Sequence, residues 1–339
     1  SLAQGRFIHP GLLHSRWDLE RIRTAVAAKK GPIFDGFKIL EDSPYARADY
    51  RMRGPFPEWG RAPNIRMGET VSDAIAVYQH ALMWVVTGRK AHAEKSIHMI
   101  NAWVGSLKKV TGIDGVLASG LQGFMFANAA ELLRYTDSGW SEEEAKRCGQ
   151  WFLDAWDPTI EHYAYFANGN WETAALQSRV AFAVYCDERE MFEETMRYAV
   201  AGAGNGSIPH MIINESGQCQ ETTRAQHYAQ LGIGLLACAA EVAWNQGVDL
   251  YGWGDNRILR GFEYTAKYGL GEEVPFVHYL DRTGKYGRGG QHKNYTEISK
   301  VSRGSFGAIF ERVLNHYSSR RGVPAPYSAR VVKKLEPEG

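Results

Sequence analysis

Residues 71–107 read VSDAIAVYQHALMWVVTGRKAHAEKSIHMINAWVGSL, and this stretch decides the fold class. Apolar side chains recur every three or four positions, first over 71–86 and then over 97–107, which is the spacing of one face of an α-helix. A short Gly-containing turn over 87–90 separates the two segments. The stretch therefore predicts two antiparallel helices joined as a hairpin.

The helical pattern extends through most of the chain. A second hairpin is predicted by 117–135 and by a capping box at Ser141 and Glu144 that opens the next helix. Further helices are expected over 222–244 and 304–317. Because no alternating run is long enough for a sheet, successive hairpins predict an all-α toroid or solenoid.

The domain organisation follows from the absence of any Pro- or Ser-rich linker. We expect one domain over 1–339. Within it, the loss of helical periodicity predicts a loop-rich insertion at about 271–303, and the end of the chain predicts a polar tail at about 328–339.

Bulk composition excludes several classes of protein. The 39 Lys and Arg residues nearly balance the 38 Asp and Glu residues, so the net charge is +1 and no nucleic-acid partner is expected. Because the net charge is close to zero, a polyanionic partner would have to bind to local clusters of basic residues. Apolar stretches such as 231–243 are shorter than the roughly 20 residues of a membrane span, so none is expected. The four cysteines form no C-x-x-C pair, which predicts buried thiols.

The first candidate segment for chemistry is 168–172, Asn-Gly-Asn-Trp-Glu, at the start of an apolar helix. It could be an Asn/Gly turn with an Asn N-cap, or the amides of Asn168 and Asn170 could hold a carboxylate. Trp171 could pack under a sugar ring or belong to the core.

The second candidate segment is 218–228, which enters the most apolar helix. Glu221, Arg224 and Tyr228 are spaced by three and four residues, which predicts that they share one helical face. The alternative is an intrahelical ion pair beside a core tyrosine. Because polar groups crowd this helix start, we favour a functional site.

The third candidate segment is 282–295, where cations and aromatic residues alternate without a helical period. It is either a solvated loop or a cover over an anionic chain. Its candidate substrate contacts are Arg288, His292 and Tyr295.

Other catalytic templates fit poorly. The sequence contains no G-x-S-x-G elbow, no phosphate-binding loop and no H-E-x-x-H metal motif, so no metal or cofactor is expected. A glycosidase would need two carboxylates on opposite sides of a sugar, for which Glu172 and Glu221 are candidates.

Several motifs together resemble the alginate lyase superfamily domain and span about residues 7–327. They are His9-Pro10-Gly11-Leu12-Leu13, Asn170-Trp171, Gln220-Glu221-x-x-Arg224-x-Gln226 with Leu231-Gly232, Ala243-Trp244-Asn245-Gln246-Gly247-x-Asp249-Leu250, and Asn315-His316-Tyr317. The resemblance implies an incomplete α/α toroid and a lyase acting on alginate or glucuronan. A substrate of that class implies a secreted or periplasmic enzyme.

One departure from the family pattern concerns the second segment. Where many relatives have Arg-Asp-Gln-Gly-His, this chain has Arg-Ala-Gln-His-Tyr over 224–228. The Asp is lost, the His comes one place earlier, and a Tyr takes its former position. The departure leaves open whether His227 or Tyr228 moves the proton.

The implied reaction is a β-elimination, in which the C5 proton of a uronate is removed and the 4-linked oxygen is expelled. The resemblance and the chemistry both suggest that Asn170 and Arg224 hold the substrate carboxylate, with Asn168 and Gln226 as weaker candidates. Glu221 would orient Arg224. The mechanism requires no metal.

The proton carrier is the least determined part of the site. Tyr228, near a cation, is the main candidate for both base and acid, while His227 competes because a histidine accepts protons at neutral pH without tuning. Since consecutive helical residues point about 100° apart, we do not expect both to face one proton. A glycoside hydrolase and a non-catalytic carbohydrate-binding toroid remain as alternatives, and the oligomeric state is open.

Overall fold

The computed structural model describes residues 5–165, 167–279 and 296–336, which form two compact units. The first unit comprises Ser1–His162, Ser178–Glu193 and Asn245–Gly247, and the second comprises Tyr163–Gln177, Glu194–Trp244 and Val248–Gly339. Each unit is therefore assembled from three separate stretches of sequence. The described residues are mostly helical, which confirms the all-α class.

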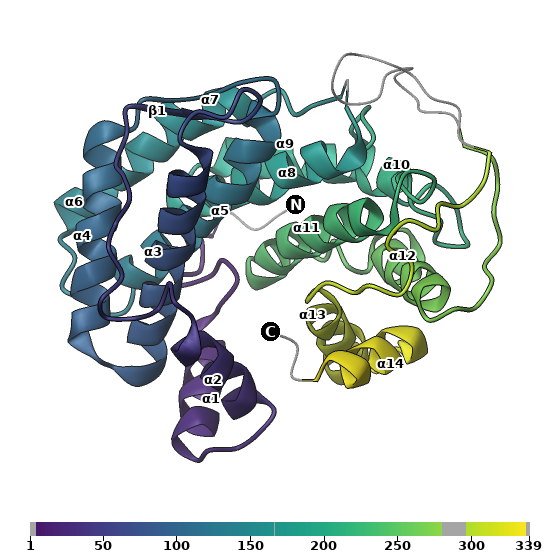
Figure 1. Cartoon of the computed structure of the whole chain (residues 1–339), viewed down its shortest axis with the longest axis horizontal. Coiled ribbons are helices and arrows are strands. Elements are labelled where there is room, and N and C mark those ends of the chain that lie inside the picture. Colours follow the sequence, from purple (N-terminus) through teal and green to yellow (C-terminus); the bar gives the residue numbers. More distant parts are fainter. Residues whose placement is uncertain (1–4, 166, 280–295, 337–339) are drawn as a thin grey trace. The chain divides into compact units, whose positions relative to one another are not determined.

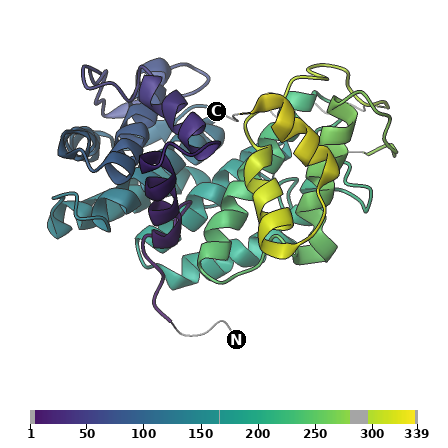
Figure 2. The same cartoon turned by 90° about the horizontal axis from the view of Figure 1, so that it is seen from below.

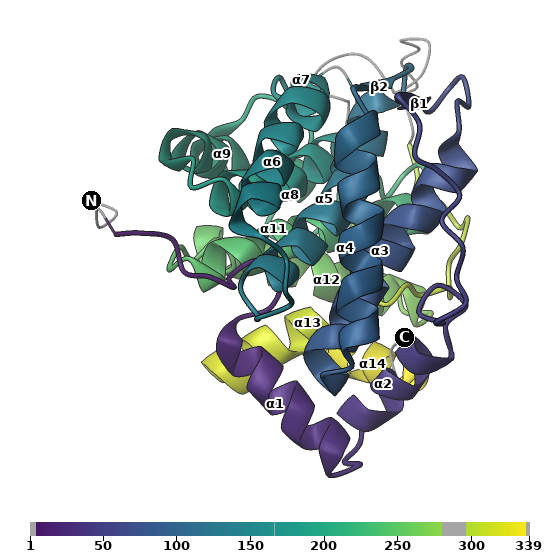
Figure 3. The ribbon, with the colours of Figure 1, turned by 90° about the vertical axis from the view of Figure 1, so that its left-hand side faces the viewer.

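The hairpin predicted by residues 71–107 forms the centre of the first unit. Helix α3 (Met67–Thr87) runs antiparallel to α4 (Lys90–Ser106), and α3 also packs along α5 (Gly115–Arg134), as Figures 1 and 3 show. Gly88 ends α3 in the left-handed conformation, with φ of 70°. Trp103 and Phe126, both fully buried, join the interior faces of these helices, with ring centroids 6.1 Å apart.

Shorter elements complete the first unit. They are α1 (Arg16–Ala27), α2 (Ile33–Asp42), α6 (Glu142–Trp151), the π-helix η1 (Phe152–Trp156), α7 (Asp157–Ile160), and the parallel strands β1 (Glu58–Gly60) and β2 (Lys109–Thr111). The capping box of Ser141 and Glu144 opens α6 as predicted.

Two helices run from one unit into the other along the chain. Helix α8 (Gly169–Tyr185) begins in the second unit and ends in the first, whereas α9 (Arg189–Ala201) begins in the first and ends in the second.

The second unit contains α10 (Ile208–Met211), α11 (Gln226–Asn245), α12 (Trp253–Gly269), α13 (Phe310–Leu314), the π-helix η3 (Asn315–Arg320) and α14 (Pro326–Leu335). Helices α13 and α14 lie beside α12, in yellow and green in Figure 2.

Three sequence predictions change in this unit. Helix α11 begins at Gln226 rather than near residue 222, and α13 begins at Phe310 rather than near residue 304. The predicted polar tail is instead largely helix α14. Its Ser328 and Val331 are buried, and the backbone N–H groups of Tyr327 and Ser328 donate to the Glu263 carboxylate at 2.9 and 2.8 Å. The Glu263 carboxylate thus satisfies the first N–H groups of α14, and the buried face of α14 packs against the rest of the second unit. Residues 271–279 and 296–303 contain neither helix nor strand.

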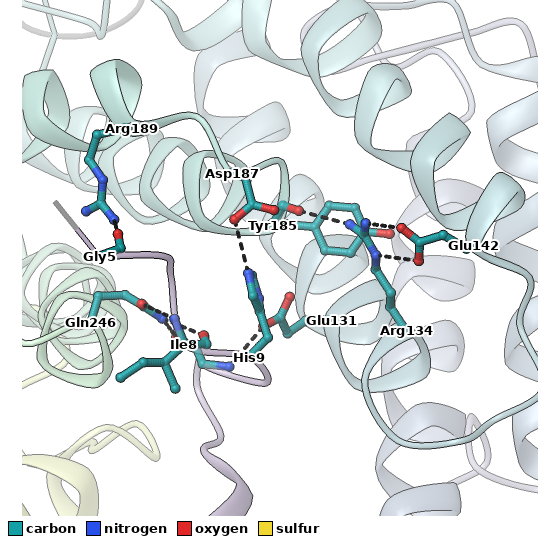
Figure 4. A network of polar contacts seen from close by, with 11 residues as sticks. Gly5, Ile8, His9, Glu131, Arg134, Glu142, Tyr185, Asp187, Arg189 and Gln246 are labelled. Carbon is teal, nitrogen blue, oxygen red and sulfur yellow. Dashed lines mark hydrogen bonds and ion pairs between the residues drawn. The ribbon is translucent and has the colours of Figure 1, made fainter.

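The N-terminal segment 5–15 is fastened to the first unit by polar contacts, shown in Figure 4. His9 Nδ1 lies 2.8 Å from the Glu131 carboxylate, which also accepts from the Gly11 N–H at 2.9 Å. On the other side, Gln246 exchanges hydrogen bonds with the backbone of Ile8 at 2.8 and 2.9 Å. These contacts explain structurally the two motifs His9–Leu13 and Ala243–Leu250, because one motif binds the other.

Only one helix in the described parts of the chain, α5, is long and apolar enough to cross a membrane by length and composition. In this structure 89% of that apolar window is buried inside the protein, as in the core helix of a folded domain.

Candidate functional site

The candidate site is built where the start of α8 meets the turn that precedes α11, both in the second unit. The first backbone N–H groups of a helix have no partner within the helix. Here the Gly169 N–H donates to Gln220 Oε1 at 3.0 Å, and the Asn170 N–H donates to Glu221 Oε2 at 2.9 Å. Two side chains from 51 residues further along the chain thus cap α8, and the carboxylate meets the positive end of the helix dipole.

Glu221 is the central acceptor of the site. Its side chain is 0% exposed, and both carboxylate oxygens accept from Asn170 Nδ2, at 2.7 and 2.8 Å. Arg224 Nη1 donates to Oε1 at 2.5 Å. Burial raises the pKa of Glu221, and the charge of Arg224 and the hydrogen bonds from Asn170 oppose that rise.

Arg224 connects Glu221 to Tyr228. Its guanidinium carbon lies 4.2 Å from the centre of the Tyr228 ring, a cation–π contact. The three residues are therefore neighbours, as their spacing predicted, but through a turn: residues 221–224 are not helical, and α11 begins only at Gln226. In the described part of the chain the remaining Arg224 nitrogens and the Tyr228 hydroxyl have no hydrogen-bond partner, so they are available to a ligand.

His227 lies beside Tyr228 rather than away from it. The two ring centroids are 4.2 Å apart with an interplanar angle of 45°, although the residues are consecutive in the first turn of α11. His227 is exposed, and its Nδ1 is 2.9 Å from Ser302 Oγ. Ser302 has a left-handed backbone, with φ of 60°. The rings of the two candidate proton carriers therefore lie side by side, and that the two do not face one proton stays a prediction.

The weaker candidates occupy more interior positions. Asn168 is buried and accepts from Gln220 Nε2 at 3.4 Å. Gln226 is buried, and its Nε2 donates to the carbonyls of Thr222 and Ser299 at 3.1 and 2.9 Å, which fastens the segment before α13 to the start of α11. Trp171 is only 7% exposed. These positions favour supporting roles for all three.

Glu172, considered above as a glycosidase carboxylate, is enclosed. It is 0% exposed and accepts from the Tyr198 hydroxyl at 2.5 Å and from the Gly206 N–H at 2.6 Å. A Cβ at Gly204 or Gly206 would collide with the Glu172 side chain, so the glycine-rich loop wraps closely around it. Glu172 and Glu221 are both buried and bonded to protein groups, which does not suit a pair of carboxylates flanking a sugar.

Sequence reasoning missed three contributors: Gln220 as a cap, Ser302 beside His227, and Tyr198 on Glu172. The glycine-rich run 202–206 could have indicated the enclosed Glu172, because glycines let the backbone approach a side chain closely. The candidate contacts Arg288, His292 and Tyr295 lie outside the described residues. Within residues 5–165, 167–279 and 296–336, no three His, Cys, Asp or Glu side chains gather as a metal site would require.

Comparison with known proteins adds a family to this geometry. The alginate lyase family profile matches residues 43–276, more than half of the chain. Among curated proteins, no sequence matches.

Solved structures of alginate lyases share the fold. One from Bacteroides ovatus is 14% identical over 96% of each chain, with a TM-score of 0.64. Alginate lyase A1-III from Sphingomonas species A1 is 14% identical over 91% of this chain and 88% of that one, with a TM-score of 0.61. A histidine-to-alanine variant of A1-III holding a tetrasaccharide is 17% identical over 80% and 82%, with a TM-score of 0.59. At these identities the likeness establishes the fold, the α/α toroid of alginate lyases.

Proposed function

This chain belongs to the alginate lyase family and is a polysaccharide lyase, and from that premise we propose that it cleaves a 4-linked uronic-acid polymer by β-elimination. The observation that carries the proposal is the cluster at the start of α11. There Arg224, held by the buried Glu221, lies against Tyr228 with its remaining nitrogens unengaged by the described residues.

Arg224 neutralises the substrate carboxylate. Removal of the C5 proton places negative charge on that carboxylate, and a fixed guanidinium stabilises the charge as it develops. Glu221 and Asn170 hold the Arg224 guanidinium in position. The Asn170 amide nitrogen is directed at Glu221, so Asn170 positions the carboxylate that positions Arg224. This arrangement changes the role expected for Asn170, from direct contact with substrate to support.

Tyr228 is the proposed proton carrier. Its deprotonated oxygen takes the C5 proton and becomes a phenol, the C5–H electron pair forms the C4=C5 double bond, and the C4–O bond breaks with its electron pair on the departing oxygen. That oxygen then receives the proton from the phenol, which returns Tyr228 to its starting form. The products are a 4,5-unsaturated uronate end and a new reducing end. His227, in contact with the Tyr228 ring and oriented by Ser302, can contact the sugar or relay the proton.

The polymer itself is proposed to be alginate, in its polymannuronate stretches, or glucuronan. Both consist of 4-linked uronates, and the solved relatives are named as alginate lyases, one of them bound to a tetrasaccharide. Since such polymers are extracellular, we propose that the enzyme meets its substrate outside the cytoplasm. Arg224 supplies the positive charge that a metal would otherwise provide, so the proposed reaction is metal-independent.

The test is ultraviolet absorbance of the new double bond on a panel of polymannuronate, polyguluronate and glucuronan. Tyr228→Phe should lower kcat by a factor of about 10³ or more, because the proton carrier is lost, while the Arg224 contact to the ring remains. Tyr327→Phe, which removes a half-buried phenol elsewhere in the second unit, is the matched control and should retain full activity. Activity should also persist in a chelator.

Two results would contradict the proposal. If no uronan yields an absorbing product, the substrate class is wrong. If Tyr228→Phe retains normal turnover while His227→Ala loses it, the proton carrier is His227.

A further inference from the structure

Helix α1 and the residues directly after it carry a concentration of positive charge that the chain as a whole lacks. Residues 16–30 contain five cations against two carboxylates, whereas the entire sequence has a net charge of +1. The cations are Arg16, Arg21, Arg23, Lys29 and Lys30, and all are exposed. A basic cluster in a nearly neutral protein favours a local anionic partner.

Most of this charge is unpaired. The carboxylate of Asp18 is buried in the N-terminal capping box with Ser15 and lies 3.6 Å from Arg21. Among the residues that the structure describes, Arg16, Arg23, Lys29 and Lys30 form no ion pair, although Arg23 Nε donates to the backbone carbonyl of Val85. Surface cations that have no carboxylate partner within the protein can meet the carboxylates of a ligand.

Trp17 gives the same surface an aromatic platform. Its side chain is 65% exposed, which is unusual for the largest aromatic residue. The Arg21 guanidinium lies 5.4 Å from its ring centroid, a contact that helps to hold the indole in place. Exposed indole rings offer a flat apolar face on which the C–H face of a sugar can stack.

A hollow lies alongside this platform. It has a volume of about 460 Å³ and is bounded by α1, the corner after it and the start of α2. Trp17, Arg21 and Lys30 contribute to its wall, together with the small side chains Ala25 and Ala28. A second hollow of about 400 Å³ borders the neighbouring face of α1 and includes Arg16 and Arg23, with Glu20 common to both. Volumes of this size suit one or two sugar residues.

We propose that this surface, formed by Trp17, Arg21, Lys30, Arg16 and Arg23, is a second binding site for the anionic polysaccharide. It consists entirely of residues other than those of the candidate site. Trp17 stacks on a sugar ring while the cations meet the carboxylates of the neighbouring uronates. The proposal rests on the proposed function for the identity of the polymer. Binding here would hold a long chain to the enzyme between cleavage events.

The test uses the otherwise intact chain carrying Tyr228→Phe, so that the polymer survives, in affinity electrophoresis through gels that contain sodium alginate or glucuronan. Trp17→Ala should weaken the apparent affinity about tenfold, the typical effect of removing a central aromatic contact. Trp17→Tyr should restore most of the retardation. Lys30→Gln should weaken binding, whereas Arg147→Gln, which removes an exposed cation on α6, should not.

Glu20→Gln provides a test with the opposite sign. Removing the carboxylate shared by both hollows should strengthen retardation, an outcome that general damage to the fold would not produce. Retardation should fall as salt rises, and a dextran gel should show none, because dextran has no charge.

Turnover separates this inference from the proposed function. In the otherwise unmodified enzyme, Trp17→Ala should raise KM on long polymer and leave the turnover of a tetrasaccharide unchanged. If the wild-type chain cleaves no uronan, the proposed function fails, whatever Trp17 does. If it cleaves uronans but Trp17→Ala binds polymer normally, or changes only the oligomeric state, the second site is wrong.

Discussion

Glu221 determines the geometry of its neighbours although it has no exposed surface of its own. Its two oxygens receive the backbone and side chain of Asn170 and the guanidinium of Arg224. A buried carboxylate is tolerated when donors compensate it, and removing it would leave those donors without a partner. The residue is thus a positioning group for the proposed chemistry.

Glu221→Ala should lower the free energy of unfolding by about 3 kcal/mol, the cost of breaking a buried charged pair. It should also reduce kcat, because Arg224 loses its anchor. Glu221→Gln keeps the shape and one acceptor oxygen, and should lose less stability than Glu221→Ala. Chemical unfolding together with uronan turnover measures both effects. Unchanged kcat in a folded Glu221→Ala protein would remove Glu221 from the mechanism.

At this scale the sequence predicted the proximity of Arg224 and Tyr228 correctly, since spacings of three and four bring residues together in turns as well as in helices. It could not predict that Asn170 faces Glu221. That contact joins positions 51 residues apart and depends on how two helix starts meet. The contact between His227 and Tyr228 likewise depends on rotamers, which spacing does not determine.

Among the elements, the N-terminal segment 5–15 has the clearest dependence on conditions. His9 stacks on Tyr135 with 4.3 Å between ring centroids, and its two nitrogens face Glu131 and Asp187. Burial disfavours the charged ring, but the hydrogen bond and charge of Glu131, with those of Asp187, outweigh burial and raise the pKa of His9 above 6.5.

A raised histidine pKa stabilises the folded state at low pH. The contribution is fully present below about pH 6.5 and is lost as pH rises through the folded-state pKa of His9. The melting temperature should therefore fall on the alkaline side, and His9→Gln should flatten that fall. Thermal unfolding across pH measures it. An equal alkaline fall in both proteins would show that His9 does not cause it.

The motif His9–Leu13 could be recognised in the sequence only as part of a resemblance. The structure was needed to explain what the motif does, because its partners Glu131, Asp187 and Gln246 come from three distant parts of the chain. Some helix boundaries likewise could not be predicted, because they depend on contacts with residues distant in the sequence. Helix α14 was missed because its buried residues are only Ser328 and Val331, of which one is polar, and because its first turn is satisfied by the distant Glu263.

Across the described parts of the molecule, three buried histidines, His80, His92 and His316, have lowered pKa values and act in the opposite sense to His9. Burial, reinforced by the charge of nearby His92, lowers the pKa of His80 in the first unit to about 3. In the second unit, burial and the charge of Arg320 lower that of His316 to about 4, against the opposing charges of Glu241 and Asp249. All three groups favour the neutral form in the folded state.

The combined contribution of these histidines to stability should therefore be greatest near pH 6.5 and decline on both sides. A depressed histidine pKa contributes stability that is present above the unfolded value of 6.5 and lost as pH falls toward the folded value, by at most about 1.4 kcal/mol per pH unit for each group. His316→Phe keeps the packing against Tyr251 and should flatten the acid side. The exposed His162→Asn is the control, and a slope unchanged by His316→Phe would contradict the assignment.

The all-α fold class could be predicted from helical periodicity. Each helix of such a protein buries one apolar face, and the regular spacing of the apolar residues on that face is visible in the sequence. The grouping of the helices into two units did not follow from helical periodicity. Residues 178–193 and 245–247 belong with the first unit although most of their sequence neighbours belong with the second, and no local pattern marks such a crossing.

That crossing has a consequence for how the protein is made. A ribosome delivers the chain in order, and the first unit lacks part of itself until residue 247 has emerged. The core around helices α3 to α5 therefore stays incomplete while residues 163–177 and 194–244 of the second unit are being synthesised. Expression of residues 1–162 alone would produce an incomplete core, so slow translation or limited chaperone supply should reduce the yield of soluble enzyme.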